Sequence, residues 1–182
     1  MDFEEKIIST KDIYSGKIFD VKEHIVELPD ATTGRRDVVL HNGGVGIIAL
    51  DCDKQVFMVT QYRIAADAVM LEIPAGKLEK GEDPYDAAMR ELSEETGYST
   101  DSLIPLGEYY ATPGYCSEKL TIFLATDLKY TGQHLDAGEF LNVKRYHIDT
   151  LYNMVMNNEI YDCKTAIAIL KVKSMLDSGM IK

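Results

Sequence analysis

The chain has 182 residues, of which 46% are hydrophobic and 27% are charged, and its formal net charge is −11 at pH 7. These values are ordinary for a soluble globular protein, and the length suits a single domain. The negative charge argues against a nucleic-acid backbone or an anionic membrane surface as the main partner. It would also repel a phosphate substrate unless metal ions invert the local potential.

The three cysteines, Cys52, Cys116 and Cys163, are far apart, odd in number and without a C-x-x-C spacing. We interpret them as buried or incidental thiols in a reducing cytosol, in preference to disulfides or a metal site. The charged N-terminus lacks the apolar segment of a signal peptide, and no run of residues is long enough to span a bilayer. The sequence therefore predicts a cytoplasmic protein.

The first 42 residues are predicted to form a β segment that precedes the main domain of residues 43–182. Residues 7–28 show strand-like alternation with a break at Glu23, a turn cluster covers 29–34, and 35–41 is again extended. We expect a β-hairpin or a small sheet. Within it, Phe19 is either a base-stacking residue or simply packed.

Arg35 and Arg36 also stand out in this segment, because the protein as a whole is acidic. They are either a solvated strand end or a contact for an anionic ligand.

Two apolar runs, 43–50 and 55–63, have the length of strands buried on both faces and are separated by a turn at 51–54. Arg63 ends the second run. Alone it would be a surface residue, but beside a phosphate site it is a candidate clamp for phosphate oxygens.

A helix is predicted between Asp83 and Gly97. Asp83 is a good N-cap, Pro84 suits the first helical position, and Gly97 can take the left-handed conformation that ends a helix.

One face of this helix carries Glu91, Glu94 and Glu95. Like charges at this spacing cost a few tenths of a kcal/mol per pair. A helix that accepts this cost favours a bound cation, and carboxylates suit Mg²⁺ or Mn²⁺. The alternative is a solvated helix of mixed charge, but that does not explain the Ile-Pro-Ala-Gly entry at 73–76.

After the helix, strands are expected at 104–110, 120–125 and 143–148, with a loop at 111–118 and a polar loop at 129–140. Helices fit 149–157 and 165–177. This order of elements predicts an α+β sandwich.

The stretch from Gly76 to Tyr98 reads Gly-x5-Glu-x7-Arg-Glu-Leu-x-Glu-Glu-x-Gly-Tyr, which is the Nudix box with every fixed position filled. The chain therefore resembles the Nudix hydrolases. That resemblance implies an α/β/α sandwich with a mixed sheet. It also implies an enzyme that uses divalent metal ions to cleave a nucleoside diphosphate linked to another moiety.

Pro113, sixteen residues after Gly97, resembles the ADP-ribose pyrophosphatase branch of this family. Further similar segments are Gly-Gly-Val at 43–45, Gln-Tyr-Arg at 61–63, Glu-Ile-Pro-Ala-Gly-Lys at 72–77, Thr-Pro-Gly at 112–114, Ser-Glu at 117–118 and Asp-Cys-Lys-Thr at 162–165. The chain departs from the branch at 136–140, which is less acidic here. The resemblance implies a homodimer, in which residues 7–42 pack against or swap with the partner's core.

Carried over to this sequence, the resemblance makes Glu91 and Glu95 metal ligands, together with the carbonyl of Ala75. Glu94 would bind another ion or act near it, so two or three ions per site are expected. Arg90 would hold the box carboxylates, Glu82 included.

Glu118, in the loop after Pro113, would be a base or a metal contact. The candidate substrate contacts are Arg63, Arg35, Arg36, Phe19, Pro113, Gly114 and Glu139.

The expected reaction converts ADP-ribose into AMP and ribose 5-phosphate, with cations bridging the phosphate oxygens and a carboxylate taking the proton of the attacking water. One alternative is a pyrophosphatase for another nucleoside diphosphate sugar, such as GDP-mannose or ADP-glucose. Another is a non-catalytic Nudix-fold domain that binds a nucleotide. Such domains usually lose box glutamates, whereas all are present here.

Overall fold

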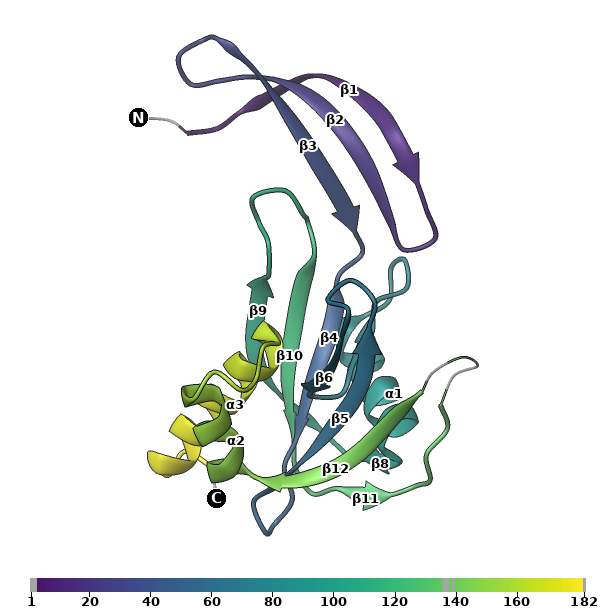
Figure 1. The fold of residues 1–182 in the computed structure, drawn as a ribbon, viewed down its shortest axis with the longest axis vertical. Helices are drawn as coiled ribbons and strands as arrows, with labels where there is room; N and C mark the ends of the chain where they lie inside the picture. The colour runs from purple at the N-terminus through teal and green to yellow at the C-terminus, as the bar shows by residue number, and fades with distance from the viewer. Residues whose placement is uncertain (1–2, 136–137, 139, 182) are drawn as a thin grey trace. The chain divides into compact units, whose positions relative to one another are not determined.

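The structure, a computed structural model, describes residues 3–135, 138 and 140–181 (Figure 1). It divides into two compact units, each described by itself below. The first comprises Met1–Gly43 and Tyr110–Lys119, and the second comprises Gly44–Tyr109 and Leu120–Lys182. No helix among the described residues is both long enough and apolar enough to cross a membrane.

The first unit is built on a three-stranded antiparallel sheet in the order β1-β2-β3. Its strands are β1 (Lys6–Ser15), β2 (Phe19–Glu27) and β3 (Thr33–His41). The expected small sheet is therefore present. Glu23, where the alternation of the sequence is interrupted, lies within β2, which pairs continuously with β3 and places Glu23 opposite Asp37. The irregularities are in β1 instead, where the register shifts between Ile7 and Ser9 and between Asp12 and Tyr14.

The second unit contains the mixed sheet that the resemblance implied. One sheet has the order β7-β4-β10-β9, with β4 and β10 parallel and β4 and β7 antiparallel. A second sheet has the order β12-β5-β6, and β8 and β11 form a short pair. The strands are β4 (Gly44–Ala49), β5 (Gln55–Arg63), β6 (Ala68–Glu72), β7 (Ala75–Lys77), β8 (Tyr98–Ser99), β9 (Leu103–Tyr110), β10 (Lys119–Ala125), β11 (Lys129–Tyr130) and β12 (Leu141–His147).

Among the described residues of this unit, three helices cover the sheets: α1 (Pro84–Thr96) on one side, and α2 (Ile148–Met156) and α3 (Cys163–Asp177) on the other (Figure 1). The ends of α1 are those that the sequence predicted. The Asp83 side chain accepts the N–H of Tyr85, and Gly97 takes a φ of 76° while its N–H bonds to the carbonyl of Ser93.

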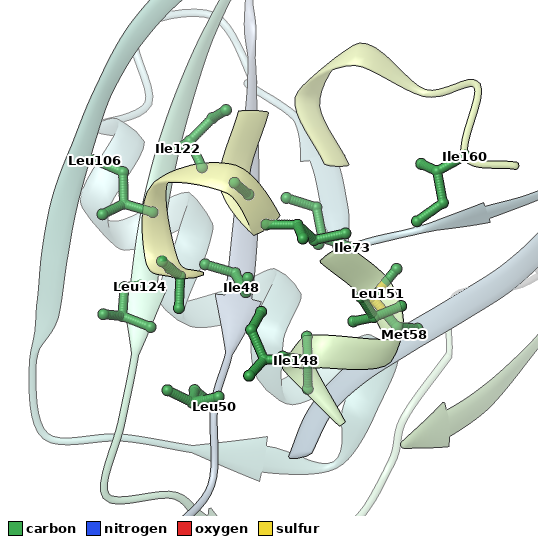
Figure 2. Packing of buried hydrophobic residues seen from close by; sticks show 14 residues of the cluster. Ile48, Leu50, Met58, Ile73, Leu106, Ile122, Leu124, Ile148, Leu151 and Ile160 are labelled. Carbon is green, nitrogen blue, oxygen red and sulfur yellow. The ribbon is translucent and has the colours of Figure 1, made fainter. Parts of the chain in front are cut away.

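Strand β4 carries the core on both of its faces, and all its residues are buried. Val45, Ile47 and Ala49 pack with Ala88 and Leu92 of α1. Because strand side chains alternate, the residues between them face the other way. There Ile48 joins a second cluster that includes residues of α2 and α3 (Figure 2). The two-sided burial predicted for this strand is confirmed.

Candidate active site

Helix α1 packs its acidic face against the short strand β7. A Cβ atom placed on Gly76 would overlap the carboxyl group and the Cγ of Glu91. Only glycine leaves room for this side chain, which is buried. Ala87, one turn before Glu91 on α1, is fully buried in the apolar cluster under the helix.

Glu95 lies one turn further along α1 and is 3% exposed. Its Oε2 atom accepts the N–H of Ala75 at 2.9 Å. Glu91 and Glu95 therefore both contact the backbone of the segment that enters the box. This contact places the carbonyl-bearing residue Ala75 beside two helix carboxylates.

Arg90 connects the box loop to the helix. Its Nη1 donates to Glu91 Oε1 at 2.8 Å and to Glu94 Oε2 at 3.0 Å, and its Nη2 donates to Glu82 Oε1 at 3.1 Å. Glu82 also accepts the N–H of Glu79 at 2.8 Å. Burial acts to lower the pKa of Arg90, but the charge of Glu91 and the hydrogen bonds to the three glutamates outweigh it and raise that pKa.

The oxygen donors of the box suit a hard divalent cation. The carboxylates of Glu82, Glu91 and Glu94 contact the guanidinium of Arg90, whereas that of Glu95 accepts the N–H of Ala75. Within the described ranges, no three acidic, His or Cys side chains are yet close enough to hold an ion. Arg90 lies against two of the predicted ligands, Glu91 and Glu94. The donor groups of these residues therefore suit a metal ion. In this structure, however, two of the predicted ligands are bound to Arg90 instead.

Arg63 ends strand β5 and forms a fork with Glu72, the last residue of β6. Arg63 Nε donates to Glu72 Oε1 at 2.7 Å and Nη2 donates to Oε2 at 2.9 Å. The Glu72 side chain is almost fully buried, and Lys164 Nζ donates to its Oε2 at 2.5 Å. Burial acts to raise the pKa of Glu72, but the Arg63 hydrogen bonds and the Lys164 charge hold it below its usual range. Sequence reasoning missed Glu72 and Lys164 as a pair, because they are 92 residues apart.

Glu118 belongs to the first unit, in the loop between β9 and β10. That loop is bonded to β3: the N–H of Val39 donates to the Tyr115 carbonyl at 2.7 Å, and the N–H of Ser117 donates to the Val39 carbonyl at 2.9 Å. The Glu118 carboxylate lies 3.8 Å from Nδ1 of His41. This nitrogen accepts the N–H of Gly43 at 3.0 Å, which suits a neutral imidazole.

His41 was not singled out from the sequence, and Ser117 was noted only within the Ser-Glu segment at 117–118, without a role of its own. The His41 N–H donates to the Ser117 hydroxyl at 2.9 Å, which adds to the attachment of the loop.

Among the predicted substrate contacts in the first unit, the two arginines and Phe19 contact other side chains of the same unit. Arg35 pairs with Glu23 at 3.0 Å and with Asp37 at 3.1 Å, and Arg36 forms a fork with Glu5. The Phe19 ring lies 5.9 Å from that of Tyr14. Pro113 and Gly114 are exposed in the loop. Glu139 lies outside the described residues.

The structure thus brings together six predicted residues in the second unit, around α1: Ala75, Glu82, Arg90, Glu91, Glu94 and Glu95. Arg63 belongs to the same unit, at the end of β5. Phe19, Arg35, Arg36, Pro113, Gly114 and Glu118 belong to the first unit.

The NUDIX domain model matches residues 40–162, and the chain belongs to the Nudix family. Enzymes of this family generally depend on divalent metal ions.

The chain is 39% identical over 179 residues to an ADP-ribose pyrophosphatase of Bacillus subtilis (strain 168), covering 96% of this chain and 97% of the relative. It is 40% identical over 169 residues to a methanol dehydrogenase activator of Bacillus methanolicus, covering 92% and 91%. An ADP-ribose pyrophosphatase of Mycobacterium tuberculosis (strain ATCC 25618 / H37Rv) is 32% identical, covering 96% and 84%. A crystal structure of an ADP compounds hydrolase shares the fold, with a TM-score of 0.86, 21% identity and 98% of each chain covered.

Proposed function

We propose that this chain hydrolyses the pyrophosphate bond of ADP-ribose to give AMP and ribose 5-phosphate, with Mg²⁺ or Mn²⁺ as cofactor and two or three ions per site. The observation that carries the proposal is the complete box, in which α1 packs Glu91 and Glu95 against Gly76 and Ala75. Near-full-length similarity to two proteins named ADP-ribose pyrophosphatase supports the choice of substrate.

In this proposal Glu91, Glu94, Glu95 and the Ala75 carbonyl hold the ions. When bound, the ions supply positive charge to the phosphate oxygens and make a coordinated water more acidic. Arg90 must then release part of its hold on Glu91 and Glu94, and it keeps Glu82 as a partner. Before metal binding, the positive charge of Arg90 therefore counteracts the repulsion between the box glutamates.

Arg63 is proposed to bind a substrate phosphate. The fork to Glu72 uses the Nε and one Nη2 N–H group, so the two N–H groups of Nη1 are not engaged by Glu72. A guanidinium held on one edge by a carboxylate can offer its other edge to a phosphate oxygen without losing the orientation that the carboxylate imposes.

Glu118 is proposed to take the proton of the attacking water, on a loop that closes over the substrate. A box glutamate that holds a metal ion is a poorer proton acceptor. Because the loop is bonded to β3 through Val39, Tyr115 and Ser117, we expect the loop and β3 to carry Glu118 together.

We propose that the protein is a cytoplasmic homodimer whose two N-terminal segments pack against or swap with the partner's core. Every residue of β1 is exposed, and Ile7, Ile8, Ile13 and Tyr14 are large apolar side chains among them. An exposed apolar surface of this kind favours a binding partner, and the family resemblance implies that the partner is a second copy of this chain. A monomeric mass by light scattering at micromolar concentration, together with full activity, would contradict this assembly.

The decisive experiment is Mg²⁺-dependent release of AMP from ADP-ribose, with ADP-glucose, GDP-mannose and NADH measured in parallel. We expect ADP-ribose to have the highest kcat/KM. A preference for GDP-mannose or ADP-glucose would favour the alternative of another nucleoside diphosphate sugar pyrophosphatase. Nucleotide binding without metal-dependent turnover would favour the non-catalytic alternative.

A further inference from the structure

Four charged side chains form a chain of ion pairs from α3 to the end of β5. Asp162 Oδ1 lies 2.9 Å from Lys164 Nζ, Lys164 Nζ lies 2.5 Å from Glu72 Oε2, and Glu72 holds the guanidinium of Arg63 by two hydrogen bonds. Negative and positive groups alternate along this chain. It starts at Asp162, the N-cap of α3, and ends at the proposed phosphate clamp.

The middle of this chain is buried. Glu72 is 1% exposed and Lys164 is 8% exposed. A buried carboxylate is costly unless cations and hydrogen bonds surround it. Glu72 Oε1 is held by Arg63, whereas Oε2 is shared between Arg63 and Lys164. Lys164 therefore fixes the orientation of the Glu72 carboxyl plane, and the fork passes this orientation on to Arg63.

The same turn of α3 also holds the peptide that enters the box. Asp162 Oδ2 accepts the N–H of Thr165 at 3.0 Å and its hydroxyl at 2.5 Å. The Thr165 hydroxyl oxygen in turn accepts the N–H of Ile73 at 2.9 Å. Asp162 thus uses one oxygen as the N-cap of α3 and the other to hold Lys164. Side chains adjacent in α3 are bonded to Glu72 and to the residue that follows it.

We propose that Lys164 and Asp162 are positioning residues for Arg63, which hold Glu72 in the one orientation that presents the Nη1 edge of Arg63 to a substrate phosphate. Neither residue belongs to the box, and neither needs to touch the substrate. This inference rests on the phosphate contact of Arg63 in the proposed function. It makes the phosphate contact of Arg63 depend on α3, a helix that begins more than 60 residues after the end of the box.

The test is a double-mutant cycle between Lys164→Gln and Arg63→Gln. Its first readout is the KM and kcat for ADP-ribose with Mg²⁺. Its second is the Kd of ADP-ribose in EDTA by titration calorimetry, which does not depend on turnover. We expect Lys164→Gln to raise KM and Kd about tenfold, the usual effect of a weakened charge-assisted phosphate contact, and to change kcat by less than about threefold. In the Arg63→Gln background it should change neither constant further.

Three further variants separate positioning from general stability. Lys164→Arg keeps the charge and should restore KM to within about threefold of wild type. Lys173→Gln is the matched control, since it removes a lysine of the same helix that pairs with Asp149 and does not contact Glu72. Its KM should equal that of wild type. Asp162→Asn keeps an N-cap but weakens the hold on Lys164, and should raise KM in the same direction even if Lys164→Gln fails to fold.

An unchanged KM and Kd in both Asp162→Asn and Lys164→Gln would overturn the proposal. It would also be overturned if the fold-changes in KM and Kd caused by Lys164→Gln and by Arg63→Gln multiplied in the double variant. Wild-type protein that binds ADP-ribose in EDTA but releases no AMP would overturn the proposed function alone, because the ratios of Kd would still decide the role of Lys164. Wild-type protein that does not bind ADP-ribose either in EDTA or with Mg²⁺ would overturn both.

Discussion

Two arginine–glutamate forks, one in each unit, show how much the surroundings change the same contact. In the first unit Arg36 binds Glu5 through two hydrogen bonds, and their side chains are 43% and 33% exposed. In the second unit Arg63 binds Glu72 by the same geometry, but the Glu72 side chain is 2% exposed and a lysine shares one of its oxygens. An exposed pair exchanges protein contacts for water at little net gain, whereas a buried carboxylate depends on its partners.

The comparison extends to the two units as wholes. Every residue of β1 is exposed, and the charge pairs of the first sheet lie on its surface. In the second unit Glu72, Glu91, Glu95 and Lys164 are buried, and each has a defined contact. In the second unit, buried contacts hold these carboxylates in fixed positions. A carboxylate held in a fixed position is suited to binding a cation or orienting a guanidinium.

The largest effect is expected at Glu95. Glu95→Gln should reduce turnover of ADP-ribose at saturating Mg²⁺ by at least about a hundredfold, because a neutral amide is a poor ligand for a hard cation. Stability should change little, since the amide oxygen can still accept the N–H of Ala75. Steady-state kinetics and thermal unfolding measure the two quantities. Turnover within a few-fold of wild type would remove Glu95 from the metal site.

Glu118 belongs to the first unit, whose charge pairs lie on the surface. A catalytic role for Glu118 would show that residues of this unit also take part in the reaction, so the contrast in burial would not by itself separate functional from structural charges. Glu118→Gln should lower kcat more than it raises KM, because a proton transfer acts only in the transition state. The metal affinity without substrate should barely change. A kcat near the wild-type value from pH 6 to 9 would leave Glu118 as a loop residue, and the base would then be Glu91, Glu94 or hydroxide itself.

Glu72→Gln breaks the buried fork and should lower the free energy of unfolding by about 3 kcal/mol, near the low end for a buried pair because Arg63 is partly exposed and can be hydrated. The effect has a defined pH dependence. Because the pKa of Glu72 is held below its ordinary value of 4.5, its contribution is present above that pH and is lost as the pH falls below it. The difference between wild type and variant should therefore shrink in acid. Denaturant titrations at pH 7 and below pH 4.5 measure it, and a difference that grows in acid would contradict it.

The smallest effect is expected for Glu5→Gln, which breaks the exposed fork. The midpoint of urea unfolding should stay within experimental scatter of wild type, because Arg36 and Glu5 are both hydrated once separated. A loss of stability equal to that of Glu72→Gln would show that burial is not what distinguishes the two forks. The same variant measured over a range of protein concentrations would reveal any contribution of this pair to the proposed homodimer.

The sequence by itself determined the local elements. Asp83, Pro84 and Gly97 mark the ends of α1 because capping depends only on neighbouring residues. The apolar runs predicted the strands β4, which is buried throughout, and β5, which is buried over residues 56–59. The box spacing identified the family for the same reason, since its contacts join residues within about two dozen positions of each other.

Only the tertiary structure decided the contacts that join distant parts of the chain. The Lys164–Glu72 pair and the Thr165–Ile73 bond each span 92 residues, and the His41–Ser117 bond spans 76. No local rule specifies such pairs, because they depend on which elements the hydrophobic core brings together. The burial of Ala87 likewise required the packing of α1 on the cluster around β4, and the fit of Glu91 against Gly76 required its packing on β7. A helical wheel gives the direction of a side chain but not the surface that it meets.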